Sequence, residues 1–420
     1  MKLKPIGDSI DGRGVVNSFM KNEIVICIST RAWDSPWSES QKVMDIVRKQ
    51  NKVYFFDPGR SVNRSLVREM IGNFANFFRI KVEEKLPNLI IVYSPPVIPF
   101  GIKQLPRVIL KPWMHIVNHI NNQIIAEHVQ RVKRKFHIKN EILYIFSPYM
   151  HQLPEKTKPQ VSCYHNYDEF SDFVKYQHIA DIIWKFEKTL TKSVDFVFCT
   201  SRAQTEKRVL ENPNTYYVPN GVNYELFKQA LNPDIPIPQD LKQIPTPIIG
   251  YTGIMADHID INLLVAIAKA FKHHSLVLVG PDRLPRSKDY YLLKSMKNVY
   301  FLGFKSMDKL PHYVKYFNVC LIPYIPKGHM LSAYPQKLLE YLSSGKPVVV
   351  TAMPMVQPYH DVIAIAHDDS EAIELIKKSL NETTTPELIE KRTQVALNNT
   401  WTNRVDVFYE HIQTKLFSKS

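Results

Sequence analysis

Short runs of β-branched and aromatic residues alternate with longer amphipathic segments along most of this chain. Strands that are buried on both faces are typically short and apolar, whereas helices repeat their apolar residues every three to four positions. The alternation therefore predicts an α/β protein with parallel sheets covered by helices. With 420 residues, 45% of them apolar, the chain is long enough for two domains of about 100–200 residues each.

Two series of such elements are predicted. In the first series we expect strands at Ile24–Ser29, Lys52–Phe56, Leu89–Tyr93, Arg107–Leu110, Ile142–Phe146, Val161–Tyr164, Phe196–Thr200 and Tyr216–Val218, and helices at Glu39–Lys49, Met114–Phe136, Phe170–Lys192 and Arg202–Glu211. In the second we expect strands at Ile248–Thr252, Ser275–Val279, Val299–Leu302, Val319–Pro323, Pro347–Val350 and Val362–Ala364, and helices at Ile261–Phe271, Met307–Tyr316, Pro335–Ser343 and Ser370–Leu380.

The two series are separated by a proline-rich stretch. Residues 228–247 contain five prolines, which remove backbone donors and fix φ, so no regular element is expected to run through them. We interpret residues 231–246 as a linker between two parallel-sheet domains. A cleft between such domains is a natural ligand site.

The chain is basic, with a formal charge of +14 and a sequence pI near 9.3. This charge favours an anionic partner: a nucleotide phosphate, a nucleic acid or an acidic membrane surface. Residues 1–250 hold most of the excess, with 34 basic and 24 acidic side chains. Five basic residues and no acidic one lie between positions 128 and 140: Arg131, Lys133, Arg134, Lys135 and Lys139. They predict either contact with anionic lipid headgroups, contact with nucleic acid phosphates, or a plain solvated helix end.

The four cysteines, Cys27, Cys163, Cys199 and Cys320, lie far apart in apolar runs and are interpreted as buried thiols in a reducing compartment. No secretory signal and no apolar run of membrane-spanning length is found. We therefore expect a cytoplasmic protein that contacts a membrane only at its surface. Metal-binding motifs such as Cys-x-x-Cys, His-Glu-x-x-His and Asp-x-Asp are absent, as is a phosphate-binding P-loop, so we expect no metal and no resident cofactor.

The segment from Leu331 to Val350 carries the strongest functional signal. It predicts a helix with Pro335 in the first turn and Gly345 after its end, followed by a buried strand. Lys337 and Glu340 are three residues apart and so lie on one face near the helix start. A helix N-terminus suits a diphosphate, with Lys337 adding charge and Glu340 accepting ribose hydroxyl hydrogen bonds. A solvated ion pair on an amphipathic helix remains the alternative.

This segment, with its Gly-Lys-Pro-Val-Val strand, resembles the nucleotide-sugar segment of GT-B fold glycosyltransferases, in particular the retaining family 4 and its teichuronic-acid-type bacterial members. Further segments with the order and spacing of that family are 194–201, 217–227, 248–264 and 276–281. Together they cover roughly residues 160–352. The final stretch, with Trp401, Val405, Phe408 and Ile412 on one stripe, resembles the family's last helix, which packs on the N-terminal domain.

The resemblance implies a GT-B fold: two Rossmann-like parallel-sheet domains facing across a cleft. Residues 1–230 would form an acceptor-binding domain, completed by a C-terminal helix at 400–420, and residues 247–399 a domain for the nucleotide sugar. It also implies donor contacts by Tyr251, Gly253, His258, Gly280, Ser332, Pro335, Lys337 and Glu340. Two of these positions depart from the family pattern. Ser332 stands where the family often has a glutamate, and His258 is the nearest candidate for the basic residue that often binds the diphosphate.

Two loops after predicted strands of the first domain supply the remaining candidates. His165 and Asp168 follow one strand, where the resemblance implies contact with the sugar and the acceptor; they could position a hydroxyl and help its proton leave. The alternative is a packed His165 and a helix cap by Asp168. The first loop carries Arg31, Trp33, Asp34 and Trp37, and its aromatic faces and polar groups predict binding of a sugar acceptor. The alternative is a loop in which Ser38 only caps the next helix.

From these observations we expect a hexosyltransferase that acts without a metal. It would move a sugar from a nucleotide-diphosphate sugar to a glycan or lipid-linked acceptor in cell-surface polysaccharide biosynthesis, with retention implied by the resemblance alone. One alternative is a glycosyltransferase that modifies nucleic acid. Another is a non-catalytic partner that binds sugar nucleotides or glycans.

Overall fold

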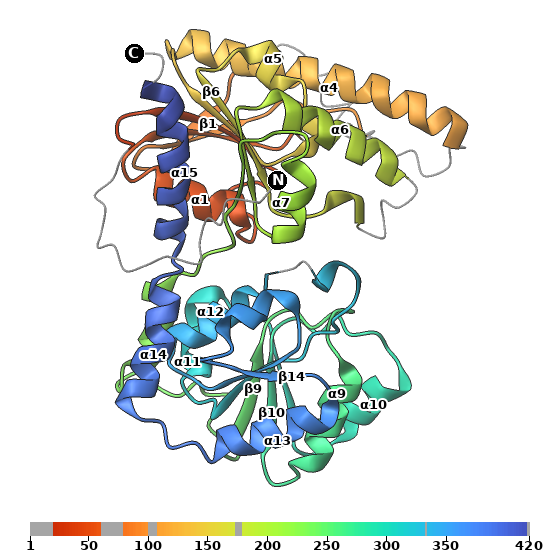
Figure 1. The fold of residues 1–420 in the computed structure, drawn as a ribbon, viewed down its shortest axis with the longest axis vertical. Helices are drawn as coiled ribbons and strands as arrows, with labels where there is room; N and C mark the ends of the chain where they lie inside the picture. Colours follow the sequence, from red (N-terminus) through yellow and green to blue (C-terminus); the bar gives the residue numbers. More distant parts are fainter. Residues whose placement is uncertain (1–19, 60–78, 100–106, 173–178, 332–333, 418–420) are drawn as a thin grey trace. The chain divides into compact units, whose positions relative to one another are not determined.

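The computed structural model describes residues 20–59, 79–99, 107–172, 179–331 and 334–417. The chain divides into two compact units (Figure 1). Unit 1 comprises Met1–Pro219 and Arg404–Ser420, and unit 2 comprises Asn220–Asn403. The division thus lies at Pro219 rather than at the expected residue 230, and the end of the chain belongs to the first unit.

Unit 1 is built on an eight-stranded sheet in the order β3-β4-β2-β1-β5-β6-β7-β8. The strands are β1 Ile24–Ile28, β2 Lys52–Asp57, β3 Val82–Leu86, β4 Leu89–Tyr93, β5 Ile142–Ile145, β6 Val161–Asn166, β7 Phe196–Cys199 and β8 Thr215–Tyr217. All neighbours pair in parallel except β3, which pairs antiparallel with β4. From β1 the chain adds β2 on one side and later returns to add β5 on the other side. The gap between β1 and β5 is therefore the topological switch point, where α/β sheets bind ligands.

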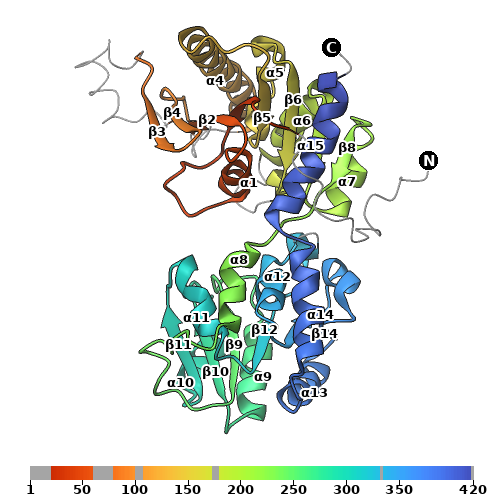
Figure 2. The same cartoon turned by 90° about the vertical axis from the view of Figure 1, so that its left-hand side faces the viewer.

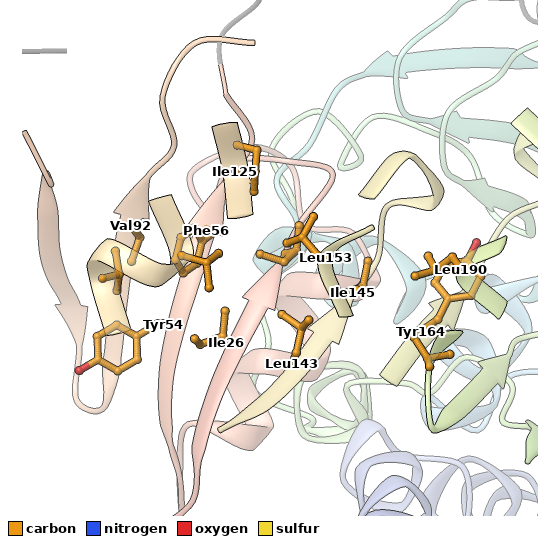
Figure 3. Close-up of a cluster of buried hydrophobic side chains, with 14 of the residues drawn as sticks. Ile26, Tyr54, Phe56, Val92, Ile125, Leu143, Ile145, Leu153, Tyr164 and Leu190 are labelled. Atoms are coloured by element: carbon orange, nitrogen blue, oxygen red, sulfur yellow. The ribbon is translucent and has the colours of Figure 1, made fainter. Parts of the chain in front are cut away.

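Helices cover both faces of this sheet. They are α1 Glu39–Val47, α4 Arg107–Lys135, α5 Leu153–Thr157, α6 Ala180–Ser193, α7 Arg202–Arg208 and α15 Trp401–Phe417. Figure 2 shows the helices α4, α6 and α15 beside the strands of this unit. Strand residues such as Ile26, Phe56 and Leu143 pack with Ile125 of α4 and Leu190 of α6 in one buried cluster (Figure 3).

The opposite face of the sheet packs against α15. Phe408 of this helix contacts Tyr144, His165 and Phe198, with ring centroids 6.0, 5.3 and 4.6 Å away. These side chains alternate along their strands with members of the first cluster, so they point to the other side. The last helix of the chain therefore completes the core of the first unit.

Unit 2 contains a six-stranded, entirely parallel sheet in the order β11-β10-β9-β12-β13-β14. The strands are β9 Ile248–Thr252, β10 Ser275–Val279, β11 Val299–Gly303, β12 Val319–Ile322, β13 Val348–Thr351 and β14 Ala364–Ala366. The helices are α8 Tyr224–Phe227, α9 Ile261–Ala270, α10 Lys288–Ser295, α11 Leu310–Val314, α12 Gln336–Ser343, α13 Asp369–Leu380 and α14 Pro386–Leu397. This strand order is that of dinucleotide-binding Rossmann folds, with the switch point between β9 and β12.

The expected strand at Arg107–Leu110 is wrong, because these residues begin the long helix α4. Leu110, Met114 and Val117 are all buried at helical spacing, and this continuous stripe outweighs the local preference of Val108 and Ile109 for a strand. The expected helix Phe170–Lys192 is also divided. A single 3-10 turn spans Phe170–Asp172, α6 starts at Ala180, and residues 173–178 lie outside the described part.

The proline-rich stretch is part of unit 2 rather than a separate linker. The Lys315 ammonium donates to the carbonyls of Asn232 and Pro233 at 2.7 and 2.6 Å, and the Tyr316 hydroxyl donates to that of Ile235 at 3.0 Å. Prolines leave carbonyls without a strand or helix partner, and the side chains that follow α11 satisfy them. Lys228–Leu231 form a 3-10 helix, whereas residues 232–247 are irregular as predicted, and the segment is fixed to its own domain.

Candidate functional site

The first candidate site lies at the carboxyl ends of β9, β10 and β12 in unit 2, on both sides of the switch point. Two glycines end the first two strands in conformations that side chains rarely adopt, Gly253 with φ of 147° and Gly280 with φ of 146°. A Cβ on Gly280 would lie 1.9 Å from the carbonyl oxygen of Gly253, so the two turns touch. Glycine is required at both positions because only bare backbone fits.

Helix α12 brings the predicted ion pair to this place. Lys337 Nζ lies 3.2 Å from Glu340 Oε2, and the side chains are 18% and 7% exposed. A Cβ on Gly253 would be 2.7 Å from Cε of Lys337, so the ammonium group reaches the first glycine turn. Burial opposes the charge of Lys337, but the carboxylate of Glu340 outweighs it, and the pKa of this lysine is raised. Because both groups are largely buried, this pair is not the solvated surface pair considered as the alternative.

The N-cap residue of α12 makes no side-chain capping hydrogen bond. Pro335 is the N-cap residue, one position before the helix, rather than the first helical residue that we expected. The first backbone amides of this helix and the positive end of its dipole lie at the same end as Lys337. Ser332 lies outside the described residues.

Three tyrosines, which the sequence analysis did not group, lie around the end of β9. Tyr251 hydrogen bonds to the carbonyl of Ile254 at 3.2 Å, and its ring meets that of Tyr324 edge to face at 6.4 Å. The Tyr341 hydroxyl accepts the amide of Thr252 at 2.8 Å. The charge of Glu340 acts on Tyr251 and Tyr324, so both rings lie beside the carboxylate. Only Tyr251 was predicted.

His258 packs its ring edge to face against Tyr324, with centroids 5.1 Å apart, and is partly exposed. The structure thus brings together Tyr251, Gly253, His258, Gly280, Pro335, Lys337 and Glu340 around the ends of β9, β10 and β12. This is the geometry of an anion site with carboxylate and hydroxyl groups beside it.

The second candidate site is a cavity of about 500 Å³ in unit 1. It lies after the carboxyl ends of β1, β2, β5 and β6, again at the switch point of the sheet. Polar and charged residues that line it are Ser29, Thr30, Arg31, Ser38, Glu39, Asp57, Ser94, Ser147, Tyr149, Tyr167 and Asp168. Its volume and mixed lining are those of a small-molecule site.

Asp168 projects into this cavity from the loop after β6. Burial and the nearby charge of Glu39 raise its pKa to about 7, although Arg31 opposes the shift. The backbone of this loop is fixed, because the Asn166 side chain donates to the carbonyl of Asp168 at 3.0 Å. A carboxyl group with a pKa near neutrality is suited to proton transfer.

The loop that carries Asp168 is anchored by a buried ion-pair network. Arg208 of α7 binds Glu169 at 2.7 Å and Glu187 of α6 at 2.8 Å. Glu187 also accepts hydrogen bonds from Tyr164 at 2.7 Å and Asn166 at 2.6 Å. Sequence reasoning missed this network because its members are spread over β6, α6 and α7.

His165 does not line the cavity. Its ring is 1% exposed, stacks on Phe146 at 4.9 Å and bonds the Tyr144 hydroxyl through Nδ1 at 3.1 Å. Burial lowers its pKa to about 3, so it stays neutral. This is the packed histidine of the alternative interpretation, and we assign it no role in proton transfer.

Of the residues predicted in the first loop, only Arg31 lines the cavity. Trp33 is 4% exposed and packs on Phe55. Asp34 is paired with Lys85 at 3.1 Å on the surface, and Trp37 is 48% exposed outside the cavity lining. Asp57, which the sequence did not single out, lines the cavity instead and accepts the Trp33 amide at 2.9 Å.

The basic stretch on α4 is less cationic than its sequence suggests. Arg131 and Arg134 both pair with Glu127, at 3.1 and 3.0 Å, and Lys133 pairs with Glu141. These acids flank the stretch on either side. Lys135 lies over the Phe136 ring at 5.4 Å and is exposed.

The first half of the same helix exposes apolar side chains. Ile109, Ile116 and Ile120 are 54%, 56% and 38% exposed and share one face. No helix of the described part is both long and apolar enough to cross a membrane. Within the same residues, no group of three or more His, Cys, Asp or Glu side chains is arranged to hold a metal ion.

Comparison with known proteins agrees with this geometry. Residues 246–381, which contain β9 to α12 and most of unit 2, match the family described as glycosyl transferases group 1. They form a group 1 glycosyl transferase domain. TuaH of Bacillus subtilis (strain 168), named as a teichuronic acid biosynthesis glycosyltransferase, is 26% identical over 231 residues. That match covers 52% of this chain and 57% of TuaH, so the chain matches only about half the length of this relative.

Solved glycosyltransferases share the fold of nearly the whole chain. A sucrose-phosphate synthase from Thermosynechococcus elongatus has a TM-score of 0.62 at 17% identity and covers 95% of this chain and 100% of its own. The E. coli trehalose-6-phosphate structure bound with UDP-2-fluoro glucose has a TM-score of 0.66 at 12% identity, with coverages of 93% and 99%. A UDP-forming trehalose-phosphate synthase from Burkholderia xenovorans has a TM-score of 0.65 at 12% identity, with coverages of 94% and 99%. The protein has the GT-B fold, as the resemblance implied.

Proposed function

We propose that this protein transfers a sugar from a nucleotide-diphosphate sugar to an acceptor hydroxyl, with the donor bound at the glycine turns of its group 1 glycosyl transferase domain. The observation that carries the proposal is the buried pair Lys337 and Glu340, held beside Gly253 at the start of α12. The two glycines allow the turns to pack against each other and Lys337 to reach the end of β9, where its positive charge would bind a diphosphate. Glu340 would accept hydrogen bonds from the ribose hydroxyls.

In the proposed reaction, the bond between the anomeric carbon and the diphosphate breaks while the acceptor oxygen bonds to that carbon on the same face. Lys337 and the helix amides would stabilise the charge that develops on the departing diphosphate, without a metal. Asp168, whose pKa of about 7 lies near neutrality, is the candidate that accepts the hydroxyl proton. Retention rests on the resemblance to family 4 enzymes.

The acceptor is proposed to be a glycan or a lipid-linked glycan bound in the cavity of unit 1. Likeness to TuaH supports a role in cell-surface polysaccharide biosynthesis. A lipid-linked acceptor would bring the protein to the membrane surface, and the exposed isoleucines of α4 with Lys135 at its end are suited to that contact. Flotation with vesicles of phosphatidylglycerol should then be reduced by Ile116→Glu and unaffected by Glu155→Gln on α5.

Calorimetric titration with uridine, guanosine and thymidine diphosphates and their sugars tests the donor site. Glu340→Gln should weaken donor binding by roughly tenfold or more, because the ribose loses a charged hydrogen-bond acceptor. Glu374→Gln, on the exposed face of α13, is the matched control and should leave donor affinity unchanged. Equal affinity of the Glu340 variant and the unaltered protein would contradict the assignment.

A second assay measures release of nucleotide diphosphate from the donor, with and without a glycan, a lipid-linked glycan or DNA. It distinguishes an enzyme from a non-catalytic binding protein. We expect release to depend on a glycan acceptor. Release that depends on DNA would favour the nucleic-acid-modifying alternative. Tight donor binding with no release under any condition would favour the non-catalytic alternative, in which Ser332 stands where family members often have a glutamate.

A further inference from the structure

The charge of the unit 1 cavity differs from the charge of the unit as a whole. Among the described residues that line it, Glu39, Asp57 and Asp168 are acidic and Arg31 alone is basic. Unit 1, which comprises Met1–Pro219 and Arg404–Ser420, has in contrast 35 basic and 23 acidic side chains. The basic excess of this part of the chain therefore lies outside the described lining of the cavity.

The carboxylates are spread around the cavity and held in place separately. The Trp33 amide fixes Asp57 from the first loop at 2.9 Å, and Asn166 fixes the backbone of Asp168 after β6 at 3.0 Å. Over the described residues they do not converge into a metal site. Hydroxyl groups line the cavity as well, including those of Thr30 and Tyr167, which hydrogen bond to each other at 2.8 Å. A lining of carboxylates and hydroxyls is suited to the many hydroxyl donors of a sugar ring.

We infer that this cavity receives a sugar end that is rich in hydroxyl donors and carries no phosphate or carboxylate, and that Asp57 and Asp168 set this selectivity. The inference rests on the proposed function and names the acceptor class of its second site. It replaces the anionic acceptor that the overall charge of the chain suggested.

Electrostatics provides the reason. A neutral sugar can donate hydroxyl hydrogen bonds to both carboxylates. Above pH 7, where Asp168 is ionised, a phosphate or carboxylate would instead be placed near three negative groups with one arginine to compensate, so the selectivity is measured at pH 8. Preference for the neutral sugar arises from repulsion between the carboxylates and an anionic sugar. The preference should therefore decrease with each carboxylate that is made neutral. An amino sugar shares the hydroxyl chemistry and adds a positive charge, so it should bind at least as well as the neutral sugar.

The test measures binding of four small probes to the full chain by saturation-transfer NMR: glucose, glucosamine, glucuronic acid and glucose 6-phosphate. Unaltered protein should bind glucose and glucosamine roughly tenfold or more tightly than the two anionic probes. Asp57→Asn and Asp168→Asn should each narrow that ratio several-fold. Glu155→Gln, which removes an exposed carboxylate of the same unit outside the cavity lining, should leave the ratio unchanged.

Three results would overturn the inference: tighter binding of an anionic probe, ratios that the two aspartate variants do not change, or no binding of any probe at millimolar concentration. These results leave the donor site untouched, because nucleotide binding is measured separately through Glu340. Failure of Glu340→Gln to weaken nucleotide binding, with the sugar selectivity intact, would instead contradict the proposed donor site and keep the cavity as a sugar site. Circular dichroism of each variant checks that unit 1 remains folded.

Discussion

Lys337 passes so close to Gly253 that a Cβ atom on the glycine would lie 2.7 Å from Cε of the lysine. The same Cβ would lie 2.7 Å from the Tyr251 hydroxyl. Gly253 also has φ of 147°, where a side chain is strained. The ammonium group, the tyrosine and the turn are therefore positioned by one another.

Gly253→Ala should consequently weaken nucleotide binding by roughly tenfold or more and reduce the free energy of unfolding by about 1–3 kcal/mol, measured by calorimetry and urea denaturation. Gly303→Ala is the matched control. That glycine also has positive φ, 69°, but nothing lies within 4 Å of its Cβ position. The control should lose about 1 kcal/mol of stability and retain nucleotide binding. Equal loss of binding in both variants would show that strain alone is responsible.

Asp168→Asn should stabilise the protein at neutral and alkaline pH. Burial and Glu39 raise the pKa of Asp168 to about 7, so the folded state binds a proton that the unfolded state has lost, and stability falls as pH rises toward that value. The asparagine variant avoids this loss. Its free energy of unfolding should exceed that of the unaltered protein by about 2 kcal/mol above pH 7, allowing for solvent in the cavity. The difference should vanish near the unfolded pKa of about 4.

His165→Phe should have the opposite pH dependence, because His165 is held neutral with a pKa of about 3. Below about pH 6.5 the His165 imidazole is protonated in the unfolded state but not in the folded state. The free energy of unfolding therefore decreases on acidification. Phenylalanine keeps the ring contacts with Phe146 and Phe408. It also removes the pH-dependent loss of stability, which amounts to about 2 kcal/mol at pH 5. At neutral pH the variant should be about 1 kcal/mol less stable, since Tyr144 loses its partner. A pH-independent difference in urea denaturation would contradict this account.

Arg208→Met should destabilise unit 1 by about 3–5 kcal/mol in urea denaturation, because Glu169 and Glu187 would be left as buried carboxylates without their shared cation. Lys207→Met is the control on the same helix. Lys207 also pairs with Glu169, at 3.3 Å, but its side chain is 59% exposed, and its loss should cost less than about 1 kcal/mol. Similar costs for the two variants would mean that burial does not govern this network.

Much of the fold could be predicted because parallel strands in this chain are buried on both faces. Strands β1, β4, β9 and β10 appear where continuous apolar runs stand in the sequence. The exposed strand β3, with Glu83, Glu84 and Lys85 at its centre, could not be predicted, because only its antiparallel pairing with β4 makes it a strand. Helix α14 was missed as well.

Site residues could be predicted where they lie close together in the sequence on one element, and not where the fold brings distant residues together. Lys337 and Glu340 are three residues apart on one helix, so spacing alone brought them together. His165 and Asp168 are equally close in sequence, but strand alternation sends the first into the core and the loop turns the second into the cavity. Asp57 and Tyr324 reach their sites through sheet topology, and a short motif does not encode that.

Helix α15 has a consequence for how the protein is made. During synthesis the strands of unit 1 emerge first, but the face formed by Tyr144 and Phe198 stays uncovered until Phe408 has left the ribosome. The whole of unit 2 is translated in between. Since domains generally fold as they emerge, the second domain is expected to fold before the first is complete, with an aromatic surface exposed to chaperones and to aggregation in the interval.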